Sequence, residues 1–200
     1  DPGSPEARLR NWVFDRALSG DIIVEQNIHT LDVMSWLFRE TPPLHCTGTG
    51  GRRVRVDVGD AWDHFALTYE YAGHIGVTFS SRQFNAHGEP DGILNRMFGT
   101  KGVFNSKYGG LVMLRGAGES YYRGGETRAI YKEGAVANIL AFHQQVTGRI
   151  TTNATVEPSV TSNLVALLGR TAAYEHRQVT WKELMASRQE LQPDFSGLTE

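Results

Sequence analysis

The sequence is poor in cysteine and lacks the long apolar runs that membrane helices need. Cys46 is the only cysteine among 200 residues, which excludes an intrachain disulfide and a zinc site built from several cysteines of one chain. No run of about 18 apolar residues occurs, and residues 1–12 have neither the basic nor the apolar segment of an export signal. These absences predict no membrane-spanning helix, and with the single cysteine they favour a cytoplasmic location.

An excess of charge of one sign is also missing. The 20 Lys and Arg residues nearly balance the 22 Asp and Glu residues, and the basic residues are scattered rather than clustered. The sequence therefore predicts no binding to nucleic acid or to an anionic membrane surface. The seven histidines form no H-x-x-x-H pair, so their spacing predicts no metal site.

The composition that remains is that of a folded domain. With 40% hydrophobic residues in a chain of 200, a sizeable core can be buried. We assign residues 1–187 to a single α+β domain and residues 188–200 to a C-terminal tail. Because the chain opens on Asp1 rather than on methionine, we expect a processed product or a piece of a longer polypeptide.

Helical periodicity occurs at both ends of the chain. Ser4 stands at the N-cap position of the first helix, and Thr180 and Glu183 have the capping-box spacing at the start of the last. Pro42 and Pro43 follow the second helix and cannot continue it. The segments with helical spacing are residues 4–18, 26–38, 133–148, 158–174 and 180–187.

Strand periodicity dominates the middle. Residues 52–84 alternate and predict antiparallel strands, with Ala72-Gly73 as a tight hairpin connection, while residues 21–24 predict a short buried strand. Glycine-punctuated strands continue over residues 95–116 and 125–131. We therefore predict an α+β fold with one open, mainly antiparallel sheet and helices on one face. The other face would be an association site, since its strands carry Phe65, Leu67, Tyr69, Val77 and Phe79.

Three ionisable residues stand where the predicted strand 21–24 meets the helix 26–38. Glu25 and His29 are four residues apart, and Asp32 follows three residues later, so all three side chains can be neighbours on a helix. A carboxylate beside an imidazole fixes its tautomer and raises its basicity, as acid-base catalysis requires. Glu25 as a helix N-cap and His29 as a buried structural histidine is the alternative interpretation.

Several segments together resemble a known enzyme family. The junction "SGDIIVEQNIHTLDVMSWLF", the turn "FGTKGVF" and the late segment "SNLVALLGRTAAYEHRQVTWKEL" resemble the C-terminal domain of the Gfo/Idh/MocA family of NAD(P)-dependent sugar oxidoreductases. The resemblance extends from about residue 8 to residue 187. It implies that His29 is the catalytic acid-base residue, that Glu25 replaces the usual aspartate partner, and that Asp32 belongs to the same catalytic motif.

The resemblance also implies parts that this sequence lacks. The family carries a Rossmann domain before this one, with a glycine-rich phosphate loop and a Glu-Lys-Pro segment, and neither is present here. The segment "GTGGRR", residues 48–53, opens a strand rather than a helix, so it offers no helix N-terminus to a pyrophosphate. We therefore expect NAD or NADP in a full-length parent and no cofactor bound by this chain alone.

Two functions are compatible with these residues. In the first, the chain is the substrate-binding and oligomerisation domain of a sugar or polyol dehydrogenase, with the Rossmann domain of the parent and a second copy as partners. In the second, it is a stand-alone carbohydrate-binding or assembly module without catalysis. Sugar hydroxyls are held by polar forks and stacked aromatic rings. The candidate substrate-binding residues are Arg10, Trp12, Gln26, Arg82 and His87.

Overall fold

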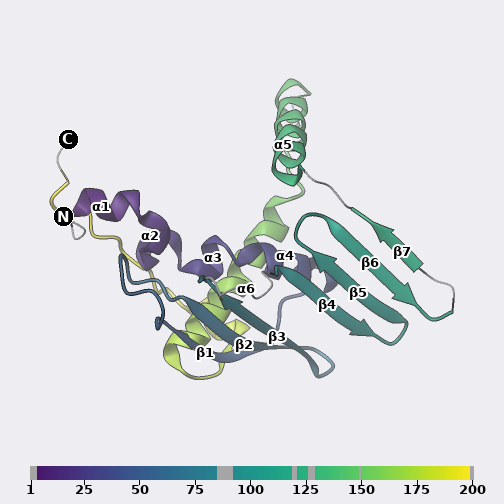
Figure 1. Cartoon of the computed structure of the whole chain (residues 1–200), viewed down its shortest axis with the longest axis horizontal. Helices are drawn as coiled ribbons and strands as arrows, with labels where there is room; N and C mark the ends of the chain where they lie inside the picture. Colours follow the sequence, from purple (N-terminus) through teal and green to yellow (C-terminus); the bar gives the residue numbers. More distant parts are fainter. Residues whose placement is uncertain (1–3, 85–91, 119–120, 126–128, 149, 199–200) are drawn as a thin grey trace. The chain divides into compact units, whose positions relative to one another are not determined.

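A computed structural model describes residues 4–84, 92–118, 121–125, 129–148 and 150–198. The chain is divided into two compact units (Figure 1). The first unit comprises Asp1–Gly88 and Glu157–Glu200, and the second comprises Glu89–Val156. The second unit is thus an insertion between two parts of the first.

The first unit begins with a series of short helices. Ser4 is the N-cap of α1, as predicted, and its hydroxyl accepts a hydrogen bond from the amide of Ala7 at 3.2 Å. The single helix predicted over 4–18 is interrupted at Asp15, which has an extended backbone because its carboxylate caps the next helix. The elements are α1 Pro5–Arg10, the 3-10 helix η1 Trp12–Phe14, α2 Arg16–Ser19, α3 Ile22–Glu25 and α4 Ile28–Leu37.

The strand predicted over residues 21–24 is wrong, because α3 occupies this segment. Asp21 caps α3 by accepting a hydrogen bond from the amide of Ile22 at 2.6 Å. Ile22 and Ile23 are fully buried. A short apolar run is compatible with either a buried strand or a buried helix, so periodicity alone does not distinguish them.

A four-stranded antiparallel sheet forms the centre of the first unit. Its strands are β1 His45–Gly51, β2 His64–Tyr71, β3 Ile75–Arg82 and β8 Val179–Thr180, in the order β3-β2-β1-β8. The predicted hairpin is confirmed, since Tyr71 pairs with Ile75 across the Ala72-Gly73 turn. The glycine-rich segment 48–51 lies within β1 and precedes no helix.

Residues 52–58, predicted as a strand, form an irregular loop instead. The amides of Arg53, Val54 and Arg55 all donate to one carboxylate oxygen of Asp63, at 2.8, 2.7 and 2.9 Å. Because three successive amides converge on one acceptor, they cannot alternate between two neighbouring strands as a sheet requires. The alternation of Val and Arg in this segment is therefore not a strand signal.

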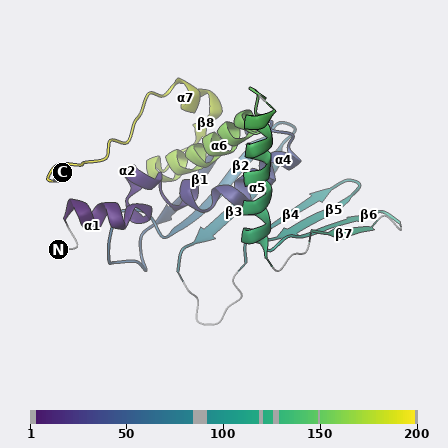
Figure 2. The same ribbon diagram turned by 90° about the horizontal axis from the view of Figure 1, so that it is seen from above.

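Helix α6, Val156–Glu175, covers one face of this sheet (Figure 2). The hydroxyl of Tyr69 donates to the carbonyl of Val165 at 3.2 Å. Gly169 permits this approach, since a Cβ there would lie 2.1 Å from the Tyr69 hydroxyl oxygen. The prediction of an open apolar face is wrong for four of its five residues, because α6 and its neighbours bury them, and Val77 is half-buried. The four buried side chains are Phe65, Leu67, Tyr69 and Phe79.

The second unit contains another four-stranded antiparallel sheet and one long helix. The strands are β4 Leu94–Gly99, β5 Gly102–Lys107, β6 Leu111–Gly116 and β7 Tyr121–Gly124, in sequential order. Helix α5, Ile130–Thr147, ends at the predicted C-cap Gly148. The strand predicted over 125–131 is wrong at its end, because α5 begins at Ile130.

The fold class is confirmed as α+β with antiparallel strands. In the described residues the strands form two four-stranded sheets rather than one continuous sheet. The last helix, α7 Trp181–Ala186 in the first unit, has the predicted capping box between Thr180 and Glu183. Within the described part of the chain, no helix has both the length and the hydropathy that crossing a membrane requires.

Candidate functional site

The junction between α3 and α4 carries the predicted catalytic residues. Glu25 is the last residue of α3, and Asn27 occupies the N-cap position of α4, so the predicted capping role of Glu25 is wrong. The amides of Gln26 and Asn27 both donate to the carbonyl of Ile22 at 2.9 Å. These bonds make α3 and α4 one continuous hydrogen-bonded segment with a bend at residues 26–27.

His29 lies in the first turn of α4 and is exposed. Glu25, four residues earlier, is half-buried, and its Oε2 is buried without a hydrogen-bond partner in the part of the chain that the structure describes. A buried carboxylate oxygen without a partner costs free energy, so such an atom is expected to meet a donor in the functional state. The junction therefore carries an accessible imidazole and, four residues earlier, a carboxylate oxygen without a donor, and no hydrogen bond or ion pair joins the two side chains among the described residues.

Asp32, the third residue of the predicted catalytic motif, is bonded to another helix. Its Oδ1 accepts a hydrogen bond from the hydroxyl of Ser162 at 2.5 Å, and Ser162 is only 1% exposed. This bond joins α4 to α6. Burial and the nearby charge of Asp32 both raise the pKa of Glu40, which follows the end of α4. Asp32 thus holds the helix that carries His29.

The predicted substrate-binding residues are spread over several elements. Gln26 is exposed at the α3–α4 bend, directly beside Glu25. Arg10 and Trp12 are exposed on α1 and η1, and Arg82 is exposed at the end of β3. His87 lies outside the described residues. Gln26 thus lies in the same α3–α4 junction as Glu25 and His29, whereas the other described candidates lie on separate elements.

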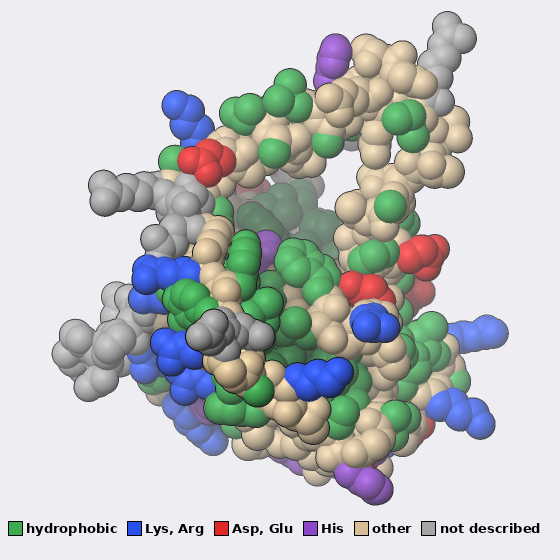
Figure 3. Space-filling model, turned by 90° about the vertical axis from the view of Figure 1, so that its right-hand side faces the viewer, with side chains coloured by type: hydrophobic (Ala, Val, Ile, Leu, Met, Phe, Trp, Pro, Cys, Tyr) green, Lys and Arg blue, Asp and Glu red, His purple; other side chains and the backbone are tan. Residues whose placement is uncertain are grey.

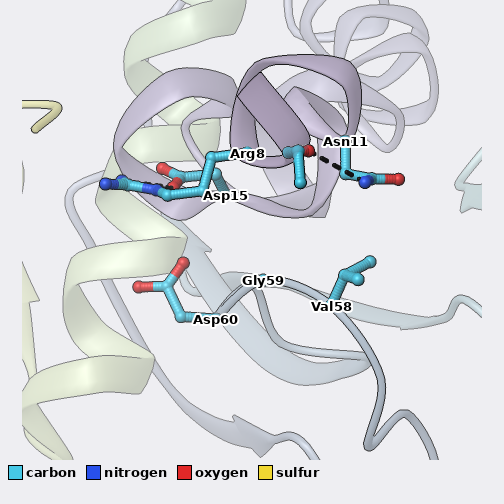
Figure 4. Close-up of a pocket in the computed structure, with 7 residues that line it drawn as sticks. Arg8, Asn11, Asp15, Val58, Gly59 and Asp60 are labelled. Atoms are coloured by element: carbon cyan, nitrogen blue, oxygen red, sulfur yellow. Dashed lines mark hydrogen bonds and ion pairs between the residues drawn. The ribbon is translucent and has the colours of Figure 1, made fainter. Parts of the chain in front are cut away.

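A cavity that the sequence did not predict lies between α1 and the loop before β2 (Figure 4). Its volume is about 340 Å³, and it is lined by Ala7, Arg8, Asn11, Asp15, Val58, Gly59 and Asp60. Asp15 accepts from Nε and Nη2 of Arg8, at 2.9 and 2.5 Å, and this pairing raises the pKa of Arg8. Nη1 of Arg8 donates to the carbonyl of Asp194 at 3.0 Å. The charged groups of the cavity are thus engaged with the protein itself.

Among the described residues, no three His, Cys, Asp or Glu side chains are grouped closely enough to hold a metal ion. Burial raises the pKa of the single thiol, Cys46, to about 12. A thiol with so high a pKa is protonated at neutral pH and is a poor nucleophile. The chemistry available at the junction is therefore that of the imidazole and the carboxylate.

Comparison with solved structures supports the same fold. An oxidoreductase from Thermotoga maritima matches with a TM-score of 0.64 and 18% identity, over 85% of this chain and 50% of that chain. The scyllo-inositol dehydrogenase from Lactobacillus casei, solved with NAD(H) and scyllo-inositol, matches with a TM-score of 0.59 and 18% identity, over 90% and 54%. A levoglucosan dehydrogenase, solved with NADH and levoglucosan, matches with a TM-score of 0.67 and 15% identity, over 90% and 54%.

The chain spans about half the length of these proteins. No curated protein matches it by sequence. The family model for the GFO/IDH/MocA C-terminal domain matches residues 1–105, which is more than half of the 200-residue chain. The chain therefore belongs to the Gfo/Idh/MocA oxidoreductase family, as a C-terminal domain.

Proposed function

We propose that this chain is the substrate-binding and oligomerisation domain of an NAD(P)-dependent sugar or polyol oxidoreductase. The family membership and the two dehydrogenase structures solved with a nicotinamide cofactor and a polyhydroxylated ring support this proposal. Those proteins share the fold and are about twice as long. The parent of this chain would accordingly combine the present domain with a nucleotide-binding domain.

The exposed imidazole of His29, four residues after Glu25 with its unpaired Oε2, is the observation that supports the proposal. His29 is the general base: it accepts the proton of the hydroxyl group on the carbon that is oxidised. The Glu25 carboxylate stabilises the imidazolium that forms. Gln26, exposed at the same bend, is placed to hold a neighbouring hydroxyl, while Asp32 keeps α4 against α6 through Ser162.

Among the described residues, the glycine-rich segment 48–51 does not fit the pyrophosphate of a dinucleotide. It is part of strand β1, which pairs with β2, and it precedes no helix whose N-terminal amides could face a ligand. The nicotinamide, which accepts a hydride when bound, would be held by another domain. We therefore expect no redox activity from the isolated 200 residues.

Two measurements test the function. The full-length protein is expected to form NAD(P)H when supplied with NAD(P) and a panel of cyclic sugars and polyols. The 200-residue chain alone is expected to show no heat of NAD(P) binding by isothermal titration. Stoichiometric cofactor binding by the isolated chain would contradict the proposal. A full-length protein that binds sugars without reducing NAD(P) would instead support a carbohydrate-binding module.

The oligomerisation role is supported by the sheet of the second unit. Strand pairing places Met97, Phe104, Leu114 and Tyr122 in one row across β4–β7, on a single face. Leu114 is 46% exposed and Tyr122 is 54% exposed. Hydrophobic side chains are also visible at the surface in the space-filling view (Figure 3). Met97 and Phe104 are half-buried. An uncharged, partly exposed row of this kind suits self-association, because two copies do not repel each other.

We expect Leu114→Glu to weaken self-association of the chain at least tenfold, because it introduces a charge into the row. Arg115→Glu is the matched control, since its side chain lies on the opposite face of the same strand. Sedimentation equilibrium measures both dissociation constants. A wild-type chain that is monomeric at high concentration, or equal dissociation constants for the two variants, would count against an interface on this face.

A further inference from the structure

Asp21, four residues before Glu25, has an unusual backbone for a non-glycine residue. Its φ is 78°, in the region that L-residues rarely adopt, and its side chain is fully buried. Such a conformation persists only where the surroundings hold it in place. The amide of Asp21 donates to the hydroxyl of Ser19 at 3.0 Å, which fixes the turn from its N-terminal side.

The carboxylate of Asp21 connects three parts of the first unit. It accepts hydrogen bonds from the amide of Ile22 at 2.6 Å, from the Tyr174 hydroxyl at 2.5 Å and from the amide of Trp62 at 3.3 Å. Burial raises the pKa of Asp21, while the bond from Tyr174 opposes that rise. Helix α3, helix α6 and the segment before β2 therefore meet at one side chain.

Two side chains of helix α6, those of Tyr174 and Arg170, are hydrogen-bonded to this turn. Tyr174 is stacked on Trp62 with ring centroids 3.8 Å apart. The Arg16 guanidinium lies 4.6 Å from the centroid of the Tyr174 ring. One turn earlier on α6, Nη1 of Arg170 donates to the carbonyl of Gly20 at 3.0 Å. Both residues of the Gly20-Asp21 turn are thus fixed by the same helix.

The restraint continues from this turn to His29. Ile22 and Ile23 are fully buried, and the carbonyl of Ile22 accepts from the amide of Asn27 at 2.9 Å. The carbonyl of Asn27 in turn accepts from the amides of Thr30 and Leu31, at 3.0 and 3.3 Å, and these bonds close the first turn of α4, in which His29 lies. Backbone hydrogen bonds thus connect the turn at Asp21 to the first turn of α4.

We propose that Asp21 and Tyr174 are positioning residues for His29, since they lock the turn from which the α3–α4 segment extends. Their effect on catalysis rests on the proposed function, whereas their effect on the order of residues 22–31 does not. Groups that orient a catalytic side chain typically change activity by roughly 10- to 100-fold when removed. Removing the Tyr174 hydroxyl is a more specific test than replacing Asp21, because it leaves the Tyr174 ring and its stacking in place.

The test compares two variants that each remove one tyrosine hydroxyl whose hydrogen bond involves α6. In Tyr174→Phe the lost bond reaches Asp21, and in the control Tyr69→Phe it reaches the carbonyl of Val165 on the same helix. In the full-length enzyme we expect Tyr174→Phe to lower kcat about tenfold, with KM changed less than about twofold. Tyr69→Phe is expected to leave kcat within about twofold at temperatures where both variants are folded.

Amide hydrogen exchange on the 200-residue chain tests the restraint without any activity. Exchange of residues 22–31 is expected to accelerate at least fivefold in Tyr174→Phe relative to Tyr69→Phe. Equal exchange in the two variants would overturn the positioning role, whatever reaction the protein performs. Faster exchange together with an unchanged kcat would show that Tyr174 only stabilises the fold, and it would also overturn the positioning role. Failure of the proposed function would be recognised separately, because the wild-type full-length protein would then oxidise no polyol.

Discussion

Replacing His29 with alanine in the full-length protein is expected to lower kcat by roughly 10²- to 10⁴-fold, the usual contribution of a positioned general base. KM should change much less, because proton transfer stabilises the transition state rather than the bound substrate. His29 is exposed and forms no side-chain hydrogen bond within the described residues, so the melting temperature should hardly change. Steady-state kinetics and thermal unfolding of the same preparation measure both quantities.

Glu25→Gln should reduce kcat in the same direction but by less, since glutamine keeps an oxygen while removing the charge that stabilises an imidazolium. His143→Ala is the matched control, because His143 is an exposed histidine on another helix, α5. A His29→Ala variant with a lower melting temperature and unchanged turnover per folded molecule would show a structural histidine. Equal activity losses in His29→Ala and His143→Ala would also contradict a base at position 29.

Local signals in the sequence predicted the elements whose stabilising contacts are close in the chain. The capping box of α7 joins Thr180 to Glu183, and Ser4 caps α1 through Ala7, so both contacts lie within one helical turn. The β2–β3 hairpin has its glycine at the turn, where Gly73 has a φ of 79° and His74 a φ of 59°. In each of these cases the chain carries the complete interaction within a few residues.

The errors concern segments whose conformation depends on distant partners. Asp21 is bonded to Tyr174 across 153 positions, and this contact helps to start a helix where the apolar run suggested a strand. Asp32 reaches Ser162 across 130 positions, so its link to α6 could not be seen in the spacing of Glu25, His29 and Asp32. Spacing identified the ionisable residues of the junction, whereas their partners depend on the fold.

Asp63 is expected to stabilise the first unit above about pH 4 through its ionised carboxylate. Its side chain is fully buried, and besides three loop amides it contacts Nδ1 of His64 at 2.6 Å through Oδ1. Burial alone would raise its pKa, but the hydrogen bonds from Arg55, His64, Val54 and Arg53 lower it to about 2. The folded state therefore favours the ionised carboxylate more than the unfolded state does.

A lowered pKa of this kind fixes the sign of the pH dependence. The stabilisation is fully present above the unfolded pKa of about 4 and is lost as the pH falls from about 4 to about 2. Asp63→Asn should accordingly lower the free energy of unfolding by about 2 kcal/mol at pH 7, because the charged acceptor of three amides is lost. The difference between wild type and variant should shrink toward zero as the pH approaches 2.

Urea unfolding of the 200-residue chain at several pH values measures this difference. Asp57→Asn is the control, because Asp57 lies in the same loop but is exposed and pairs with Arg52 and Arg55 at 3.8 and 3.5 Å. Exposed ion pairs contribute about 0 to 1 kcal/mol, so this variant should change stability little at any pH. If the deficit of Asp63→Asn persisted undiminished at pH 2, its cause would be the NH2 donor that asparagine introduces rather than the loss of the negative charge. If both variants lost equal stability at pH 7, the convergence of three amides on Asp63 would not be what orders residues 52–58.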